Sequence, residues 1–245
     1  MPEVWLFGIL VATTLLAFTV AGAAGFGGGV IMLPVLVWAF GPKDAIPILT
    51  VSTLLAAVSR TGLNWRDISW PVVTWHSLGA IPIAVLASFL FVFAPPAVLT
   101  RVLGGVLLLL VLFQHTNLGR SGTLGLRKFV FVGAGTSLVG GFLGGAGVIQ
   151  APFLLSYGLT RMAFVGTGAI TALLLQVTKL AVFGTTDLLN TQNVLAGVAL
   201  GVVGFAGSYV GRWVANSASE RAFRIIVETL LVIGGILLLI TGCGN

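Results

Sequence analysis

The chain has 245 residues, of which 58% are hydrophobic and only 7% are charged, and its mean hydropathy is +1.13. Soluble domains carry about 25% charged residues, so this composition excludes an ordinary soluble protein and predicts a multi-pass helical membrane protein. The net charge of +6 comes from Lys and Arg scattered over short loops, a pattern that indicates orientation in a membrane and not nucleic-acid binding.

Ten hydrophobic segments follow one another along the chain, and most approach the roughly 20 residues that a helix needs to cross a bilayer. Two are shorter, 28–40 and 147–158, and at about 1.5 Å per residue a helix of a dozen residues covers only ~18 Å. Such a helix would end or start near the middle of the membrane. The expected segments are 4–24, 28–40, 44–62, 70–93, 97–116, 128–145, 147–158, 162–183, 192–214 and 222–241.

The two short segments are copies of each other. Residues 29–36 read GVIMLPVL and residues 147–154 read GVIQAPFL, which agree at five of eight positions at an offset of 118. A hydrophobic chain with two related, glycine-interrupted halves is typical of transporters built from internal repeats. We therefore expect two transmembrane repeats, 1–118 and 119–245.

The distribution of basic residues predicts how these repeats are oriented. Lys and Arg concentrate around the loops at 62–70, 116–128 and 214–222, whereas the loops at 93–97 and 184–191 have none. Basic loops face the cytoplasm, and each half then has five traverses, an odd number. The prediction is an all-α fold of two inverted five-segment repeats.

The glycine-rich starts of the short segments are the first candidate site. The free N–H groups and the positive dipole at a helix start favour an anion, and two starts that face each other would form a small-anion site near the midplane. The alternative is that these glycines only permit tight helix packing. The residues concerned are Gly27, Gly28 and Gly29 in the first copy, and Gly145, Ala146 and Gly147 in the second.

Polar side chains in and after the short segments are the second group. Hydroxyls and amides could contact anion oxygens, although Ser and Thr in membrane helices often bond their own backbone. Gln150 is of particular interest because it replaces the apolar Met32 of the other copy, and Gln176 is a further amide in an apolar run. The hydroxyl residues are Thr50, Ser52, Thr53, Thr167 and Thr171.

Three of the charged residues inside hydrophobic segments are further candidates. Arg60 and Lys179 occupy nearly equivalent positions in the two halves and could attract an anion, or extend to the lipid headgroups. Glu228 is a candidate for proton coupling, although Arg224, four residues earlier, could pair with it. His76 and His115, near segment ends, are expected at the membrane interface.

The sequence does not indicate an enzyme. It contains no HExxH or GxSxG motif, and its apolar segments hold no pair of carboxylates. The single cysteine, Cys243, excludes an intrachain disulfide and a cysteine-based metal site. We expect neither a cofactor nor a bound metal.

At these residues the chain resembles the sulfite exporter TauE/SafE family. The resemblance rests on GGGVIMLP at 27–34 and on its duplicate GGFLGGAGVIQAP at 140–152, in which Ala146 stands where the family prefers glycine. Further likeness lies in LTVS at 49–52, VGTG at 165–168 and RTGLNW at 60–65. The resemblance implies export or exchange of small sulfur-containing anions such as sulfite, sulfoacetate and related organosulfonates.

We therefore expect a secondary transporter, an exporter of a small anion that works by alternating access in a bacterial inner (cytoplasmic) membrane. Its partners would be a small anionic substrate and the lipid bilayer, with no nucleic acid, and a homodimer is compatible with the sequence. Two alternatives stay open. One is a channel for a small anion or neutral solute, and the other is a non-transporting membrane scaffold or accessory subunit.

Overall fold

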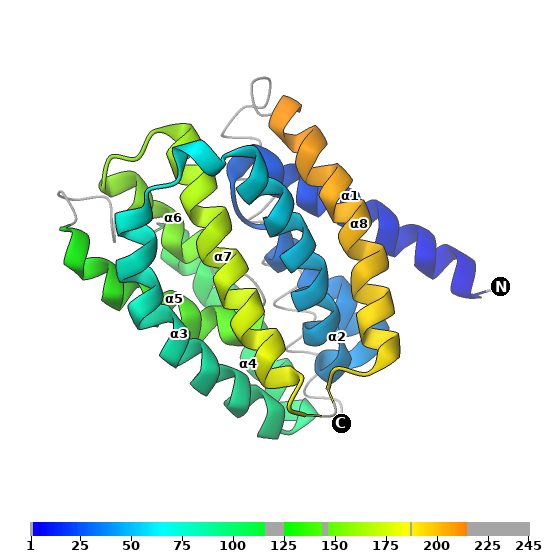
Figure 1. Ribbon diagram of the computed structural model, residues 1–245. Helices are drawn as coiled ribbons and strands as arrows, with labels where there is room; N and C mark the ends of the chain where they lie inside the picture. Colours follow the sequence, from blue (N-terminus) through cyan, green and yellow to red (C-terminus); the bar gives the residue numbers. More distant parts are fainter. Residues whose placement is uncertain (1, 116–124, 144–146, 187, 215–245) are drawn as a thin grey trace.

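The computed structural model of the chain describes residues 2–115, 125–143, 147–186 and 188–214. Within these residues the secondary structure is entirely helical, and the helices form one bundle (Figure 1). The α-helices are α1 (Pro2–Ala24), α2 (Gly28–Leu63), α3 (Trp70–Phe93), α4 (Pro96–His115), α5 (Phe129–Leu143), α6 (Gly147–Ser156), α7 (Arg161–Phe183) and α8 (Thr191–Val214), with short 3-10 turns at η1 (Trp65–Asp67) and η2 (Leu126–Lys128).

The helix α2 is two helices joined at a break. Gly41 has φ 75° and ψ 164°, a left-handed φ that favours glycine, and Pro42 follows it without an N–H to continue the ladder. The first part therefore ends where the sequence predicts the end of the short segment 28–40. The other short segment, α6, ends near Gly158, which also has a positive φ of 87°.

The lengths of the helices agree with a membrane protein. Five helices in the described part of the chain are long and apolar enough to cross a bilayer: Trp5–Ala24, Gly28–Leu63, Trp70–Phe93, Met162–Phe183 and Thr191–Gly211. The all-helical, multi-pass prediction is thus confirmed. Ten segments in two inverted repeats stay a prediction, because the expected segment 222–241 lies outside the described residues.

Pairs of tryptophans lie at the ends of the helices. The rings of Trp5 and Trp38 are 6.0 Å apart, and those of Trp65 and Trp70 are 5.2 Å apart. All four side chains are exposed. Exposed tryptophans at helix ends are typical of the membrane–water interface.

The closest helix contacts join the predicted halves. α1 packs along α8, α3 packs along α5, and α2 contacts both α7 and α8 (Figure 1). A Cβ at Gly211 would overlap the Thr19 carbonyl, and a Cβ at Gly133 would overlap the His76 carbonyl, so glycine is what permits both approaches. By the sequence offset of 118, α1 corresponds to α5 and α8 to α3. The two contacts are therefore equivalent, and each predicted half packs its first helix against the other half.

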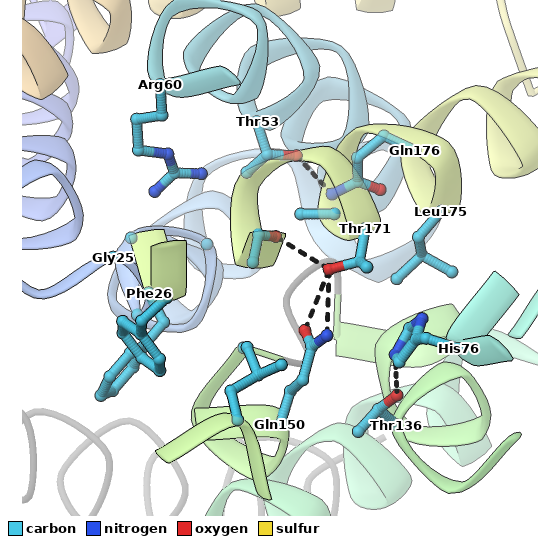
Figure 2. A pocket seen from close by; sticks show the side chains of 18 of the residues that line it. Gly25, Phe26, Thr53, Arg60, His76, Thr136, Gln150, Thr171, Leu175 and Gln176 are labelled. Carbon is cyan, nitrogen blue, oxygen red and sulfur yellow. Dashed lines mark hydrogen bonds between the residues drawn. The ribbon is translucent and has the colours of Figure 1, made fainter. Parts of the chain in front are cut away.

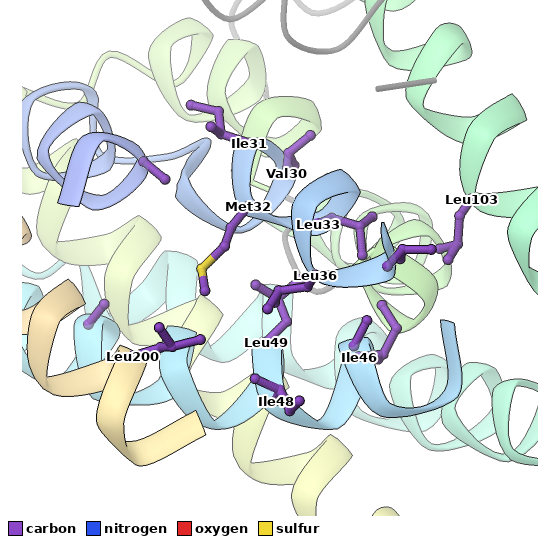
Figure 3. Close-up of a cluster of buried hydrophobic side chains, with 14 of the residues drawn as sticks. Val30, Ile31, Met32, Leu33, Leu36, Ile46, Ile48, Leu49, Leu103 and Leu200 are labelled. Atoms are coloured by element: carbon purple, nitrogen blue, oxygen red, sulfur yellow. The ribbon is translucent and has the colours of Figure 1, made fainter. Parts of the chain in front are cut away.

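The first part of α2 folds back into the main apolar core. Met32, Leu33 and Leu36 are fully buried in a cluster with Ile46 and Leu49 from the second part of the same helix (Figure 3). The Thr14 hydroxyl of α1 contacts the Met32 sulfur at 3.7 Å. This packing fixes the start of α2 deep inside the bundle.

Candidate functional site

A cavity of about 60 Å³ lies at the start of α2, deep inside the bundle (Figure 2). A single buried water needs roughly 10–15 Å³ measured in this way, so the cavity can hold a small polyatomic ion or several waters. Its walls come from α1, α2, α3, α5, α6 and α7. The polar side chains that line it are Thr53, Arg60, His76, Thr136, Ser137, Gln150, Thr171 and Gln176.

The starts of the two short helices meet at this cavity. Gly27 precedes α2 with φ 97°, and Gly25 has φ 84°, so the chain turns sharply between α1 and α2. A Cβ placed on Gly147, the first residue of α6, would lie only 2.6 Å from the Phe26 Cβ. Gly27, Gly28, Gly29 and Gly147 all line the cavity. The positive ends of two helix dipoles therefore lie at one polar cavity.

Neighbouring glycines serve different purposes. A Cβ on Gly28 would lie 3.0 Å from Ala21 and from Phe18, so Gly28 permits tight packing of α2 against α1. Gly27 has open space around it and is required by its left-handed backbone. Close packing therefore accounts for Gly28 and backbone conformation for Gly27, while anion binding by these helix starts stays a prediction.

Two hydrogen-bonded amide–hydroxyl pairs form part of the cavity wall. Gln150 Nε2 donates to Thr171 Oγ1 at 3.0 Å, and Gln176 Nε2 donates to Thr53 Oγ1 at 2.6 Å (Figure 2). Thr53 and Thr171 are equivalent residues of the two sequence copies. The first pair joins α6 to α7 and the second joins α7 to α2, so these bonds connect the helices that form the walls.

His76 lines the cavity, a position that the sequence does not predict. We expect it at the membrane interface, but it is buried, lines the cavity, and its Nε2 lies 3.2 Å from the Thr136 hydroxyl of α5 (Figure 2). The interfacial prediction is therefore wrong. Its physical reason is the close glycine-mediated contact of α3 with α5, which covers this turn of α3 and turns the ring inward.

Arg60 is the one permanently charged side chain among the described residues that line the cavity. It is only 8% exposed, its Nη1 donates to the Ala21 carbonyl at 3.5 Å, and its buried Nε has no hydrogen-bond partner. It does not extend to the lipid headgroups. Among the described residues no carboxylate lines the cavity, and no cluster of His, Cys, Asp and Glu could hold a metal. The chemistry of the walls therefore favours an anion.

Other predicted site residues lie away from the cavity. Thr50 and Ser52 donate to the Ile46 and Leu49 carbonyls of their own helix, which is the backbone alternative. Thr167 accepts from the Ser69 N–H, and the buried Lys179 donates to the Gly140 carbonyl at 3.2 Å. Gly145, Ala146 and Glu228 lie outside the described residues.

Three polar lining residues are additional to those that the sequence singles out: His76, Thr136 and Ser137. Gln176, named above as an amide in an apolar run, lines the cavity as well. Thr136 and Ser137 give no such signal, because hydroxyls are common in membrane helices and usually bond their own backbone. Only the packing of α5 against α3 brings them to the cavity.

One comparison with known proteins gives a match. A family model described as Sulfite exporter TauE/SafE matches residues 10–238, nearly the whole chain, and confirms the resemblance predicted from the glycine-led repeats. Neither a curated protein nor a solved structure matches the chain. The match and the apolar helices together identify a multi-pass membrane protein of a transporter family.

Proposed function

We propose that this chain, which belongs to the sulfite exporter TauE/SafE family, is a secondary transporter that exports a small sulfur-containing anion. Sulfite or an organosulfonate such as sulfoacetate would bind in the central cavity. The protein would act in a bacterial inner membrane and release the anion by alternating access between two inverted repeats, 1–118 and 119–245.

One observation carries this proposal. The starts of both short helices line the same cavity, together with a buried arginine and with no carboxylate among the described lining residues. If the glycines only permitted tight helix packing, no polar cavity would be needed where the starts of the two short helices meet. A backbone that leaves its helix inside a membrane is tolerated where it lines such a cavity.

The walls offer the kinds of donor that an oxyanion needs. The first N–H groups of α2 have no acceptor within the helix, and Arg60 Nε is a buried donor without a partner. The Gln150 and Gln176 amides now donate to threonine hydroxyls, and each could exchange that bond for one to the anion. Hydrogen bonds to a charged group are about twice as strong as neutral ones.

The helix contacts are those expected of two halves related by a two-fold axis. Such a relation requires that α1 on α8 be matched by α5 on α3, and these are the two most extensive contacts among the described helices. It also requires α2 and α7 to meet at the centre, where the cavity lies. Rocking of one half against the other about this centre would open the cavity to each face in turn.

The membrane potential would favour export. Moving one negative charge out of a cell with a negative interior is downhill by about 2.3 kcal/mol per 100 mV. An anion exporter therefore needs no energy source beyond the potential and the substrate gradient.

The test uses purified protein with a panel of anions: sulfite, sulfate, thiosulfate, sulfoacetate and simple carboxylates, with taurine as a zwitterionic comparison. We expect a small sulfur-containing anion to raise the melting temperature and to show saturable uptake and counterflow in proteoliposomes. Arg60→Met protein, which lacks the cavity's charge, should show both effects only at about 10- to 100-fold higher anion concentration.

The same assays separate the alternatives. A conductance that does not saturate and shows no counterflow would identify a channel. The absence of any anion-dependent stabilisation or flux would contradict transport and would favour a scaffold or an accessory subunit.

A further inference from the structure

Two buried cations occupy matching places in the predicted halves. Arg60 Nη1 donates to the Ala21 carbonyl at 3.5 Å, and Lys179 Nζ donates to the Gly140 carbonyl at 3.2 Å. In each pair the donor and the acceptor are 39 residues apart. The two pairs are related by an offset of 119, one position from the 118 of the sequence repeat.

The acceptors are equivalent as well. Ala21 lies near the C-terminal end of α1, and Gly140 lies near that of α5. The carbonyls at a helix C-terminus carry the negative end of the dipole. Each cation therefore rests on the negative end of the first helix of its own half.

The two cations differ in one respect. Arg60 lines the cavity, whereas Lys179 is fully buried, does not line it, and has its Nζ 5.8 Å from the centre of the Phe183 ring. Lys179 lies only three residues beyond the cavity residue Gln176 on α7, about one helical turn. The two cations therefore have matching places in the sequence, but only Arg60 lines the cavity in this structure.

Neither cation has a carboxylate partner within the described part of the chain. A buried charge with only a carbonyl beside it is costly, and ionisable residues inside membranes commonly mark an ion pathway. An anion that visits the site would compensate the charge.

We propose that Lys179 is a second anion-binding residue, which replaces Arg60 in the cavity when the transporter opens to the opposite membrane face. This inference rests on the proposed function. If the two halves exchange conformations during the cycle, α7 takes the place that the second part of α2 now has. Lys179 then faces the substrate, as Arg60 does now, while Arg60 leaves the wall of the cavity.

Accessibility tests the exchange without any substrate. Cys243 is the single cysteine, so Cys243→Ser provides a background for Arg60→Cys and Lys179→Cys. In oriented vesicles a membrane-impermeant cationic methanethiosulfonate should label the two positions from opposite faces, in buffer free of sulfite, which would cleave the label. Ala169→Cys, equally buried on α7 and outside the cavity lining, should stay unlabelled from both faces.

The labelling pattern decides the matter. If Lys179→Cys is inert from both faces, or reacts from the same face as Arg60→Cys, the exchange is excluded. Ready labelling of Ala169→Cys would show general loosening of α7 and would equally count against a specific opening at Lys179.

A binding and flux comparison gives a second readout. Lys179→Met should keep sulfite-dependent thermal stabilisation, because the present cavity contains Arg60, while saturable exchange falls about 10- to 100-fold. Lys179→Arg should retain most exchange. Parental flux in Lys179→Met, or joint loss of binding and flux, would overturn the inference.

A parent protein that neither binds nor moves any anion would instead contradict the proposed function, and the labelling experiment would still decide whether Lys179 alternates with Arg60.

Discussion

Gln176 Nε2 donates a 2.6 Å hydrogen bond to Thr53 Oγ1, which joins residues that are 123 positions apart in the sequence. The bond crosses from α7 to α2 beside the cavity (Figure 2). Both side chains are buried, so the bond is shielded from water and fixes the spacing of the two central helices. A substrate that draws the Gln176 amide away from Thr53 would break this bond, and occupancy of the cavity would then be coupled to the contact between the halves.

Thr53→Val tests this coupling. Valine keeps the shape but removes the acceptor of the Gln176 amide, and loss of a buried partner costs about 1–3 kcal/mol. We expect a lower melting temperature and a weakened sulfite-dependent stabilisation. Thr53→Ser is the matched control and should behave like the parent. In the double variant Thr53→Val/Gln176→Leu most of the stability should return, and strict additivity of the two single effects would contradict the coupling.

Arg60→Met tests the charge of the cavity. Removing a donor that bonds a charged ligand costs about 1.5–3 kcal/mol, so we expect the apparent affinity for the transported anion to fall about 10- to 100-fold. Concentration-dependent melting curves measure this directly. Arg66→Met, which alters an exposed arginine in η1, should leave affinity unchanged. Equal losses in both variants would indicate a general charge effect and not a site.

Gln150→Met tests the asymmetry between the two copies. It installs the residue that the first copy has at Met32, and it removes the bonds between Gln150 and Thr171. We expect several-fold weaker anion binding, since neutral hydrogen bonds are worth about 0.5–1.5 kcal/mol. The reciprocal change, Met32→Gln, buries an amide in the apolar core around Leu36 and should lower stability without altering affinity in the folded fraction. Unchanged affinity in Gln150→Met would remove Gln150 from the binding site.

Hydropathy and the repeat predict most of the helices. The break at Gly41 falls between the expected segments 28–40 and 44–62, and α3 (Trp70–Phe93) coincides with the expected 70–93. These boundaries are local in origin, since glycine and proline interrupt apolar runs whatever the tertiary structure. The approach of the two helix starts was also predictable, because the sequence copies are led by glycines that lack bulky side chains.

The remaining walls of the cavity depend on long-range packing. His76 is close to a helix start, which usually means the interface, but glycines in α3 and α5 let these helices approach and bury it. The hydroxyls of Thr50, Ser52 and Thr53 all donate to their own helix, but Thr53 also accepts from Gln176 of α7. Which hydroxyl on a helix faces the cavity depends on the rotation of that helix, and a repeat found in the sequence does not set that rotation.

Gly133→Ala tests the glycine-mediated contact of α5 with α3. The added methyl group would overlap the His76 carbonyl, and such overpacking costs about 1–3 kcal/mol. We expect a lower melting temperature and, because His76 would move with its helix, loss of anion-dependent stabilisation. Gly135→Ala is the matched control on the same helix, since its Cβ would meet nothing within 4 Å. There alanine should be neutral or stabilise the helix by about 0.5–1 kcal/mol.

Cysteine labelling tests the predicted orientation. In the Cys243→Ser background, Pro95→Cys lies in the loop after α3 and Arg66→Cys lies in η1, and both positions are exposed. The loop at 93–97 has no Lys or Arg, so it should face away from the cytoplasm, while η1 should face it. An impermeant maleimide added to intact cells should therefore label Pro95→Cys at once, and Arg66→Cys only after lysis. The reverse pattern would invert the orientation of the whole bundle, whereas labelling of both positions in intact cells would show that α3 does not cross the membrane.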